Sequence, residues 1–208
     1  GSIFTAYQCY VNDILIAENG KISVSSKGEE PSCKPVTAFF LPPAEEFDLI
    51  IHVSNFTRAQ GGISEEIVFD TAEQIREYES FLKYKDGIII GMLTLIAISV
   101  FCYSLLSRIS RKNLMFILMC IILIVRTMFS GDYLIVQLFP DIPFQSLVWI
   151  FYLTVIWFPV ILYHMIESYT GKLIPSFTRI FFPYAFVLSA LTGLAPISVY
   201  TRWFGAIE

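Results

Sequence analysis

One apolar stretch determines how the rest of the chain must be interpreted: GIIIGMLTLIAISVFCYSLL, at Gly87–Leu106. Its roughly 20 residues, at about 1.5 Å each, match a hydrocarbon core of about 30 Å. Three more apolar stretches follow, at about Asn113–Phe129, Ser146–Tyr169 and Ile180–Tyr200. Since backbone polar groups in lipid must satisfy one another, we expect a bundle of about four membrane-spanning helices over residues 87–208.

The two parts of the chain differ in composition. Of the 208 residues, 55% are hydrophobic and 15% are charged, against about 25% charge in a typical soluble domain. Residues 1–86 contain 7 Lys/Arg and 14 Asp/Glu, whereas residues 87–208 contain 7 and 4. The first part is therefore expected in water and the second in lipid. The basic residues form no continuous stripe, so nucleic acid is not an expected partner.

The basic residues between the stretches predict the orientation of the chain. Positive residues stay in the cytoplasm. The segment Gly131–Gln145, between the second and third stretches, has no Lys or Arg, while the loops on either side of it carry Arg108, Arg111, Lys112, Lys172 and Arg179. We therefore expect a multi-pass protein of the cell membrane with an extracytoplasmic N-terminal domain, and interpret the chain as a fragment of a longer protein.

Three polar residues within the apolar half are candidates for coupling between helices. Arg126, near the outer end of the second stretch, has three alternatives: it reaches the interface, pairs with Asp132, or lines a ligand cavity. His164 and Glu167, spaced i, i+3, share one face of the third helix near its cytoplasmic end. That spacing also occurs in metal-binding bundles, but the other stretches supply no carboxylate, so we expect a hydrogen-bonded pair and no metal site.

The polar half, Gly1–Asp70, shows the alternation of short antiparallel strands. Turns are predicted at Asn12–Asp13 and Asn19–Gly20. The strands are predicted at Ala6–Val11, Ile14–Ala17, Lys21–Ser25, Val36–Leu41, Phe47–Ser54 and Ile63–Asp70. Six short strands with frequent turns indicate a β-sandwich, incomplete in this chain.

A helical connector, Thr71–Asp86, follows the strands. Thr71 and Gln74 have the spacing of a capping box, and only Asp86 and Gly87 separate the connector from the first apolar stretch. Because such a join is stiffer than a Gly/Ser linker, it can transmit a tilt or rotation into the membrane.

The sequence offers no catalytic or cofactor site. His52 alternates with apolar residues in a predicted strand, where a partly exposed sheet residue is expected. Cys9 and Cys33 leave two alternatives evenly open, a disulfide or two free thiols. There is no CxxC motif, phosphate loop or serine elbow, so we expect no zinc, no cofactor and no enzyme activity in this chain.

Several segments of the polar half resemble one receptor family. They are Tyr10–Asp13 (YVND), Glu18–Lys21 (ENGK) and Leu49–Phe56 (LIIHVSNF), with Arg58 and Gly61–Ile63 (GGI). This pattern resembles the second type of extracellular domain in bacterial seven-transmembrane receptors with diverse intracellular signalling modules, the DISM receptors. Two departures are that Asn12–Asp13 stands where the family commonly has Asn-Gly, and that no output module is present.

The resemblance implies a jelly-roll ectodomain similar to carbohydrate-binding modules, seven spans, and an enzymatic output such as a diguanylate cyclase or histidine kinase in the full-length protein. We expect a receptor that senses an extracytoplasmic small ligand, such as a carbohydrate. Because aromatic faces and amides suit sugars, Tyr7, Tyr10 and Asn55 are candidate ligand-binding residues.

The expected partners are the lipid bilayer, a saccharide or other small ligand, a cytoplasmic signalling module in the same chain and a second copy as a homodimer. The alternative function is an accessory or structural membrane protein whose β-domain docks a protein partner. A transporter ranks below both because few charges lie at mid-bilayer.

Overall fold

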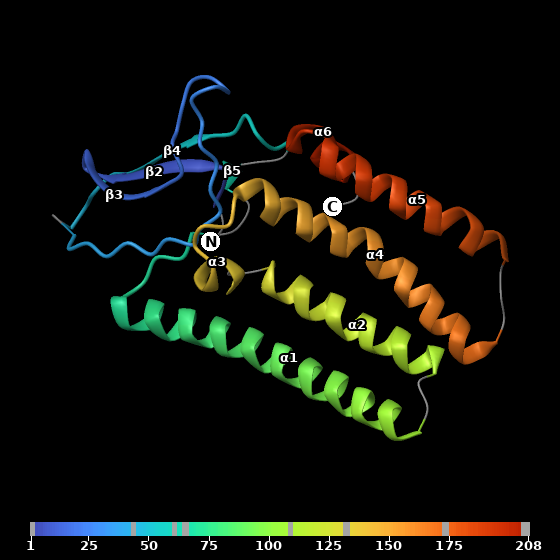
Figure 1. Ribbon diagram of the computed structural model, residues 1–208. Helices are drawn as coiled ribbons and strands as arrows, with labels where there is room; N and C mark the ends of the chain where they lie inside the picture. The colour runs from blue at the N-terminus through green and yellow to red at the C-terminus, as the bar shows by residue number, and fades with distance from the viewer. Residues whose placement is uncertain are drawn as a thin grey trace. The chain divides into compact units, whose positions relative to one another are not determined.

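The chain is mostly helical, with a small antiparallel sheet near its N-terminus (Figure 1). This computed structural model describes residues 3–42, 45–59, 62–63, 67–107, 110–130, 134–171 and 175–204. The chain divides into two compact units. The β unit comprises Gly1–Glu79, Asp141–Gln145 and Ala195–Glu208, and the helical unit comprises Ser80–Pro140 and Ser146–Leu194.

The β unit contains one three-stranded sheet and a two-residue strand pair. The strands are β1 (Ile3–Phe4), β2 (Ala6–Val11), β3 (Ile14–Asn19), β4 (Leu49–Ser54) and β5 (Gly62–Ile63). The sheet has the order β3-β2-β4 and is antiparallel throughout, while β1 pairs with β5. The predicted antiparallel sheet is thus confirmed for β2, β3 and β4.

The turn between β2 and β3 forms where the sequence predicts it. Asn12 and Asp13 have φ angles of 43° and 68°, as a type I′ hairpin requires of both central residues. Asn12 also ties this turn to the chain before β4, since its Oδ1 accepts from the Asp48 N–H at 2.8 Å and its own N–H donates to the Asp48 carbonyl at 3.1 Å. Asn12 therefore holds both the turn between β2 and β3 and the start of β4.

The predicted strand at Lys21–Ser25 is wrong. Lys21 forms only an isolated bridge with Glu30, and the chain between them bends and turns. The Ser25 N–H donates to Ser23 Oγ at 3.1 Å, and the Gly28 N–H donates to the Ser25 carbonyl at 3.2 Å. Serine side chains offer the backbone local hydrogen bonds that compete with a strand ladder, and here the local bonds prevail.

The predicted strand at Val36–Leu41 is also wrong, because its aromatic side chains pack outside any ladder. The Phe40 ring centroid lies 5.4 Å from that of Phe47 and 6.0 Å from that of Phe69. Of the predicted strand Ile63–Asp70, only Ile63 is in a strand, residues 67–70 are irregular, and residues 64–66, like Gly61, lie outside the described part. An aromatic cluster thus takes the place of the predicted strand at Val36–Leu41.

Helices form at all four apolar stretches. The helices of the described residues are α1 (Ala72–Ser107), α2 (Arg111–Met128), α3 (Leu134–Leu138), α4 (Phe144–Thr170), α5 (Pro175–Leu194) and α6 (Ile197–Phe204). In the described part of the chain, α1 and α4 are long and apolar enough to cross a membrane. The predicted fourth helix is interrupted at Ala195–Pro196, because proline lacks the N–H that a continuous helix needs and disfavours helical backbone before it.

The connector and the first apolar stretch form a single helix. α1 begins after Thr71, whose Oγ1 accepts from the Gln74 N–H at 3.5 Å, and it continues through Gly87 to Ser107. Asp86 is therefore not a helix end. The boundary between the two units falls inside α1, between Glu79 and Ser80.

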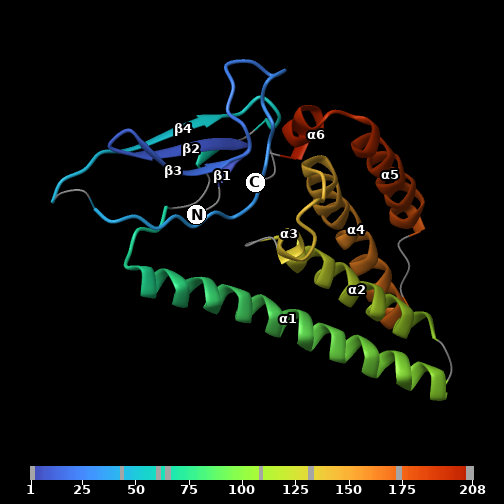
Figure 2. The same ribbon diagram turned by 60° about the vertical axis from the view of Figure 1, so that its left-hand side comes forward.

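Within the helical unit, α2 lies between α1 and α4, and α5 lies beside α4 (Figures 1 and 2). α4 carries much of the core, with Tyr152, Ile156 and Val160 all buried. Its Trp157 Nε1 donates to Ser189 Oγ of α5 at 3.0 Å. Such interhelical hydrogen bonds fix the register of apolar helices that pack through otherwise unspecific surfaces.

Candidate functional site

A charged cluster joins the first turn of α2 to the last turns of α4. Glu167 Oε2 lies 2.9 Å from His164 Nδ1 and 3.4 Å from a terminal guanidinium nitrogen of Arg111. The Glu167 side chain is buried, with 5% exposed, whereas Arg111 is 58% exposed. The predicted His164–Glu167 hydrogen bond is present, and the structure adds Arg111 as a third member.

The geometry of this Arg111 cluster assigns the histidine proton. A carboxylate oxygen only accepts, so the 2.9 Å contact requires the proton on His164 Nδ1. The Arg111 guanidinium lies 3.4 Å from the same nitrogen, but two donors cannot bond, so both donate to Glu167. Nδ1 of His164 is then committed to Glu167, and Nε2 is the ring nitrogen left to accept or donate elsewhere.

Neighbouring polar contacts connect this end of α2 to α1. Asn113 Nδ2 donates to Ser104 Oγ at 2.9 Å, and Ser104 is buried. Ser110 caps α2 by accepting from the Asn113 N–H at 3.3 Å. Three helices thus meet through side-chain hydrogen bonds at one end of the helical unit, which holds them in a defined register.

Arg126 contacts an aromatic ring. Its guanidinium carbon lies 5.3 Å from the centroid of the Phe151 ring on α4, a cation–π contact. Asp132, one of the partners considered for it, lies outside the described residues. Arg126 therefore joins α2 to α4 well away from the Arg111 cluster, and the two sets of candidates do not form one site.

No metal site can be built from the residues described. Among them, no three His, Cys, Asp or Glu side chains come together. His164 and Glu167 have a guanidinium as their third neighbour, and a cation there repels a metal ion.

The three sugar-binding candidates do not converge. Tyr7 and Tyr10 are three residues apart in β2, so they point to opposite faces of the sheet, and Tyr7 is buried. Burial, followed by the proximity of Cys9, raises the pKa of Tyr7. The Asn55 amide is used locally: its Nδ2 donates to the Arg58 carbonyl at 3.0 Å, and its Oδ1 accepts from the Arg58 N–H at 3.0 Å.

Tyr10 is more accessible than the buried Tyr7. It is half-buried, its hydroxyl donates to Gln8 Oε1 at 2.9 Å, and its ring centroid lies 5.4 Å from that of His52. His52 is exposed, as predicted. These two rings form an accessible aromatic and polar surface on the sheet, and His52 rather than Tyr7 is the residue that accompanies Tyr10.

A buried carboxylate that sequence reasoning missed organises the turn after β4. Glu29 is 8% exposed, and it accepts from Ser54 Oγ at 2.9 Å, from the Phe56 N–H at 3.0 Å and from Thr57 Oγ1 at 2.8 Å. Since Glu29 lies in a Ser/Gly/Glu loop more than 20 residues away, no local pattern reveals this role. It fixes the VSNF segment in place.

Three further contacts within the β unit attach its loops to helices. The Thr37 hydroxyl hydrogen-bonds the Glu79 carboxylate of α1, and the Arg76 guanidinium lies 5.3 Å from the centroid of the Phe39 ring. On the other side, the Ala59 N–H donates to Thr201 Oγ1 of α6 at 3.0 Å. The loop Val36–Leu41 therefore contacts α1, and the turn after β4 contacts α6.

All four cysteines are free thiols. Of the two alternatives for Cys9 and Cys33, the structure has the free pair. Burial raises the pKa of the Cys33 thiol to about 11, and burial also raises the pKa of Cys9.

Comparison with known proteins adds no identification. No family model matches the chain, and no curated protein or solved structure matches it either.

Proposed function

We propose that the chain is the sensing and membrane-spanning part of a bacterial receptor of the DISM type. In this proposal the β unit belongs to an extracytoplasmic jelly roll that binds a small ligand such as a saccharide. The helices carry the signal across the membrane to a cytoplasmic output module in the full-length protein.

The observation that carries the proposal is the continuity of α1. Its first two turns belong to the β unit and the remainder to the helical unit, without a break at Gly87. A helix has no soft joint at which a displacement could be absorbed, so a shift at Arg76 or Glu79 reaches the apolar segment. A soluble domain tethered by a flexible linker would lack this property.

By length and composition, α1 and α4 are each able to cross a membrane. We propose that α2 and α5 also span it. α2 has 18 residues and α5 has 20, about 27 Å and 30 Å at 1.5 Å per residue. The charges of α2 are Arg111, Lys112 and Arg126, all within its first or last turn. Long basic side chains at helix ends reach the interface, so they are compatible with a span.

Cysteine labelling in intact cells tests the topology. Ser26→Cys and Lys112→Cys both alter exposed side chains, each introduced into a chain whose native cysteines are replaced. A membrane-impermeant maleimide should label Ser26→Cys in intact cells and Lys112→Cys only after lysis. Labelling in the reverse order would overturn the proposed orientation, and labelling of both would argue against a membrane barrier between them.

A glycan array with the detergent-purified chain tests saccharide binding. His52→Ala and Tyr10→Ala should each weaken binding, because these rings form the accessible surface on the sheet. Tyr84→Ala, a change of an exposed tyrosine on α1, serves as the matched control. Binding that is absent, or equally reduced by the control, would contradict a sugar site on the sheet.

A flexible Gly/Ser insertion after Asp86 tests signal transmission in the full-length receptor. It should abolish ligand-dependent output while leaving ligand affinity unchanged, because it interrupts α1 between its first turns, which belong to the β unit, and the apolar segment that begins at Gly87. The same insertion in the exposed loop after Ser26 is the control and should leave output intact. Unchanged output with the first insertion would contradict transmission through α1.

The second candidate function is docking of a protein partner by the β unit. It is favoured by apolar side chains that remain exposed on the sheet: Leu49 at 44%, Ile50 at 42% and Ile14 at 68%. A second sheet of a jelly roll would cover such residues, and so would a partner. Leu49→Asp should abolish capture of a partner in a pull-down without changing glycan binding if docking is the function, because Leu49 lies on the face of the sheet opposite Tyr10 and His52.

A further inference from the structure

A cleft of about 280 Å³ opens near the Arg111 cluster. Three helices contribute to its wall: Ser99, Val100 and Tyr103 from α1, Asn113 and Phe116 from α2, and Tyr169 from α4. The wall is mainly aromatic and aliphatic, with a hydroxyl and an amide as its polar groups. Tyr103 and Tyr169 are 64% and 57% exposed, so the cleft has open aromatic sides.

The lining residues lie close to the ends of their helices. Ser99 and Tyr103 precede the end of α1 at Ser107 by about 12 Å and 6 Å along the helix axis. Phe116 follows the start of α2 by about 8 Å, and Tyr169 is the penultimate residue of α4. In a spanning bundle this is the depth at which lipid tails join the glycerol and headgroup.

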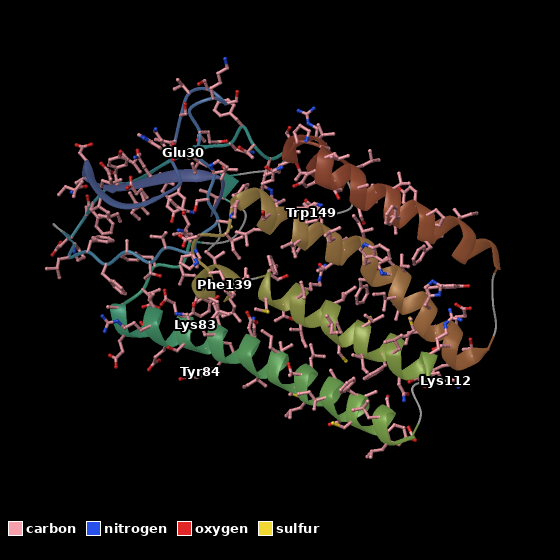
Figure 3. All side chains as sticks on the ribbon, in the orientation of Figure 1. Glu30, Lys83, Tyr84, Lys112, Phe139 and Trp149 are labelled. Atoms are coloured by element: carbon pink, nitrogen blue, oxygen red, sulfur yellow. The ribbon has the colours of Figure 1, made fainter. Side chains whose placement is uncertain are left out.

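A positive charge stands at the rim of the cleft. Lys112 Nζ lies 5.7 Å from the centroid of the Tyr169 ring, and the lysine is exposed at the start of α2 (Figure 3). No carboxylate among the described residues forms an ion pair with it, whereas the neighbouring Arg111 is paired with Glu167 at 3.4 Å. The rim therefore presents a cation that the described part of the protein does not neutralise.

We propose that this cleft binds an anionic phospholipid. The phosphate contacts Lys112 at the rim, and the first methylene groups of an acyl chain lie against Val100, Phe116 and the tyrosine rings. Charge complementarity selects an anionic headgroup over a zwitterionic one, as basic pockets between membrane helices do. The inference rests on the proposed membrane topology and adds to it a specific lipid that bridges α1, α2 and α4.

Lipid binding to the whole chain tests the inference. The chain is placed in nanodiscs of phosphatidylcholine or of phosphatidylcholine with phosphatidylglycerol, and bound lipid is counted by native mass spectrometry. Lys112→Gln should weaken phosphatidylglycerol binding about fivefold, the equivalent of about 1 kcal/mol per basic residue. Lys83→Gln removes an equal charge from an exposed position distant along α1 and should change nothing.

A second variant separates the cleft from the charge. Ser99→Trp fills the cleft while keeping Lys112, and it should abolish the preference for phosphatidylglycerol. Equal effects of Lys112→Gln and Lys83→Gln, an intact preference in Ser99→Trp, or displacement of the lipid by excess inorganic phosphate would each overturn the lipid site. A chain that never enters nanodiscs would instead refute the membrane function, so the two failures are distinguishable.

Discussion

Replacing Glu29 should release the turn that follows β4. This carboxylate is 8% exposed and accepts from Ser54, Phe56 and Thr57, so Glu29→Ala removes a shared acceptor from three donors. An unsatisfied buried donor costs about 1–3 kcal/mol, and the two half-buried hydroxyls can turn toward water. We therefore expect a loss of about 3 kcal/mol, which is about 1 kcal/mol for each of the three charge-assisted hydrogen bonds.

Hydrogen exchange at the Phe56 amide measures this loss directly. A loss of about 3 kcal/mol corresponds to exchange about 150-fold faster when opening is rapid and reversible. Glu29→Gln keeps one acceptor oxygen, so it should cost about 1 kcal/mol and accelerate exchange about fivefold. The graded response separates loss of the acceptor from loss of side-chain packing.

The adjacent Glu30 provides the matched control. Its carboxylate lies 3.6 Å from Lys21 Nζ, with both side chains mostly exposed. Such surface pairs contribute about 0–1 kcal/mol, so Glu30→Gln should leave Phe56 exchange nearly unchanged. If the Phe56 amide exchanges at the same rate in Glu29→Ala and in Glu30→Gln, Glu29 does not hold the turn.

Four further substitutions can be measured on the same chain. Asn12→Ala should cost about 2 kcal/mol in denaturant unfolding, since it loses a hydrogen bond and a tolerated positive φ, whereas Asp13→Gly should be neutral or stabilising. Because the folded pKa of Cys33 is about 11 and the unfolded value about 9, its thiol contribution is full below pH 9 and is lost as pH rises to 11. The stability difference between wild type and Cys33→Ala should therefore shrink by about 2–3 kcal/mol over that range. Glu167→Leu should lower the thermal midpoint in detergent, because it leaves Arg111 without its carboxylate, and an unchanged midpoint would contradict a stabilising cluster.

The sequence predicts a turn or a helix start correctly where neighbouring residues alone determine the backbone. Asn12–Asp13 form the predicted turn because both residues tolerate positive φ, and Thr71 begins the predicted helix because its hydroxyl caps the first turn. The apolar stretches contain helices, as their length and composition predict.

Local signals failed where a distant partner decides the outcome. Val36–Leu41 alternates like a strand, but Phe40 packs with Phe47 and Phe69, and that choice depends on residues up to 29 positions away. Likewise, His164 and Glu167 are visibly paired in sequence, while Arg111 joins them from 56 residues away. The pattern within one helix predicts the His164–Glu167 pair, but it cannot predict Arg111, which lies on another helix.

The two attachments of the β unit to helices differ in strength. Thr201 of α6 is buried at 3% exposure where it accepts from the Ala59 N–H, so water competes poorly with that bond. The Thr37–Glu79 contact on α1 is exposed, and water can replace it at little cost. A conformational switch needs an element with two arrangements of similar energy. In the proposed receptor we therefore expect ligand binding to change the exposed contacts of Thr37 and Arg76 with α1 before those of the buried Thr201.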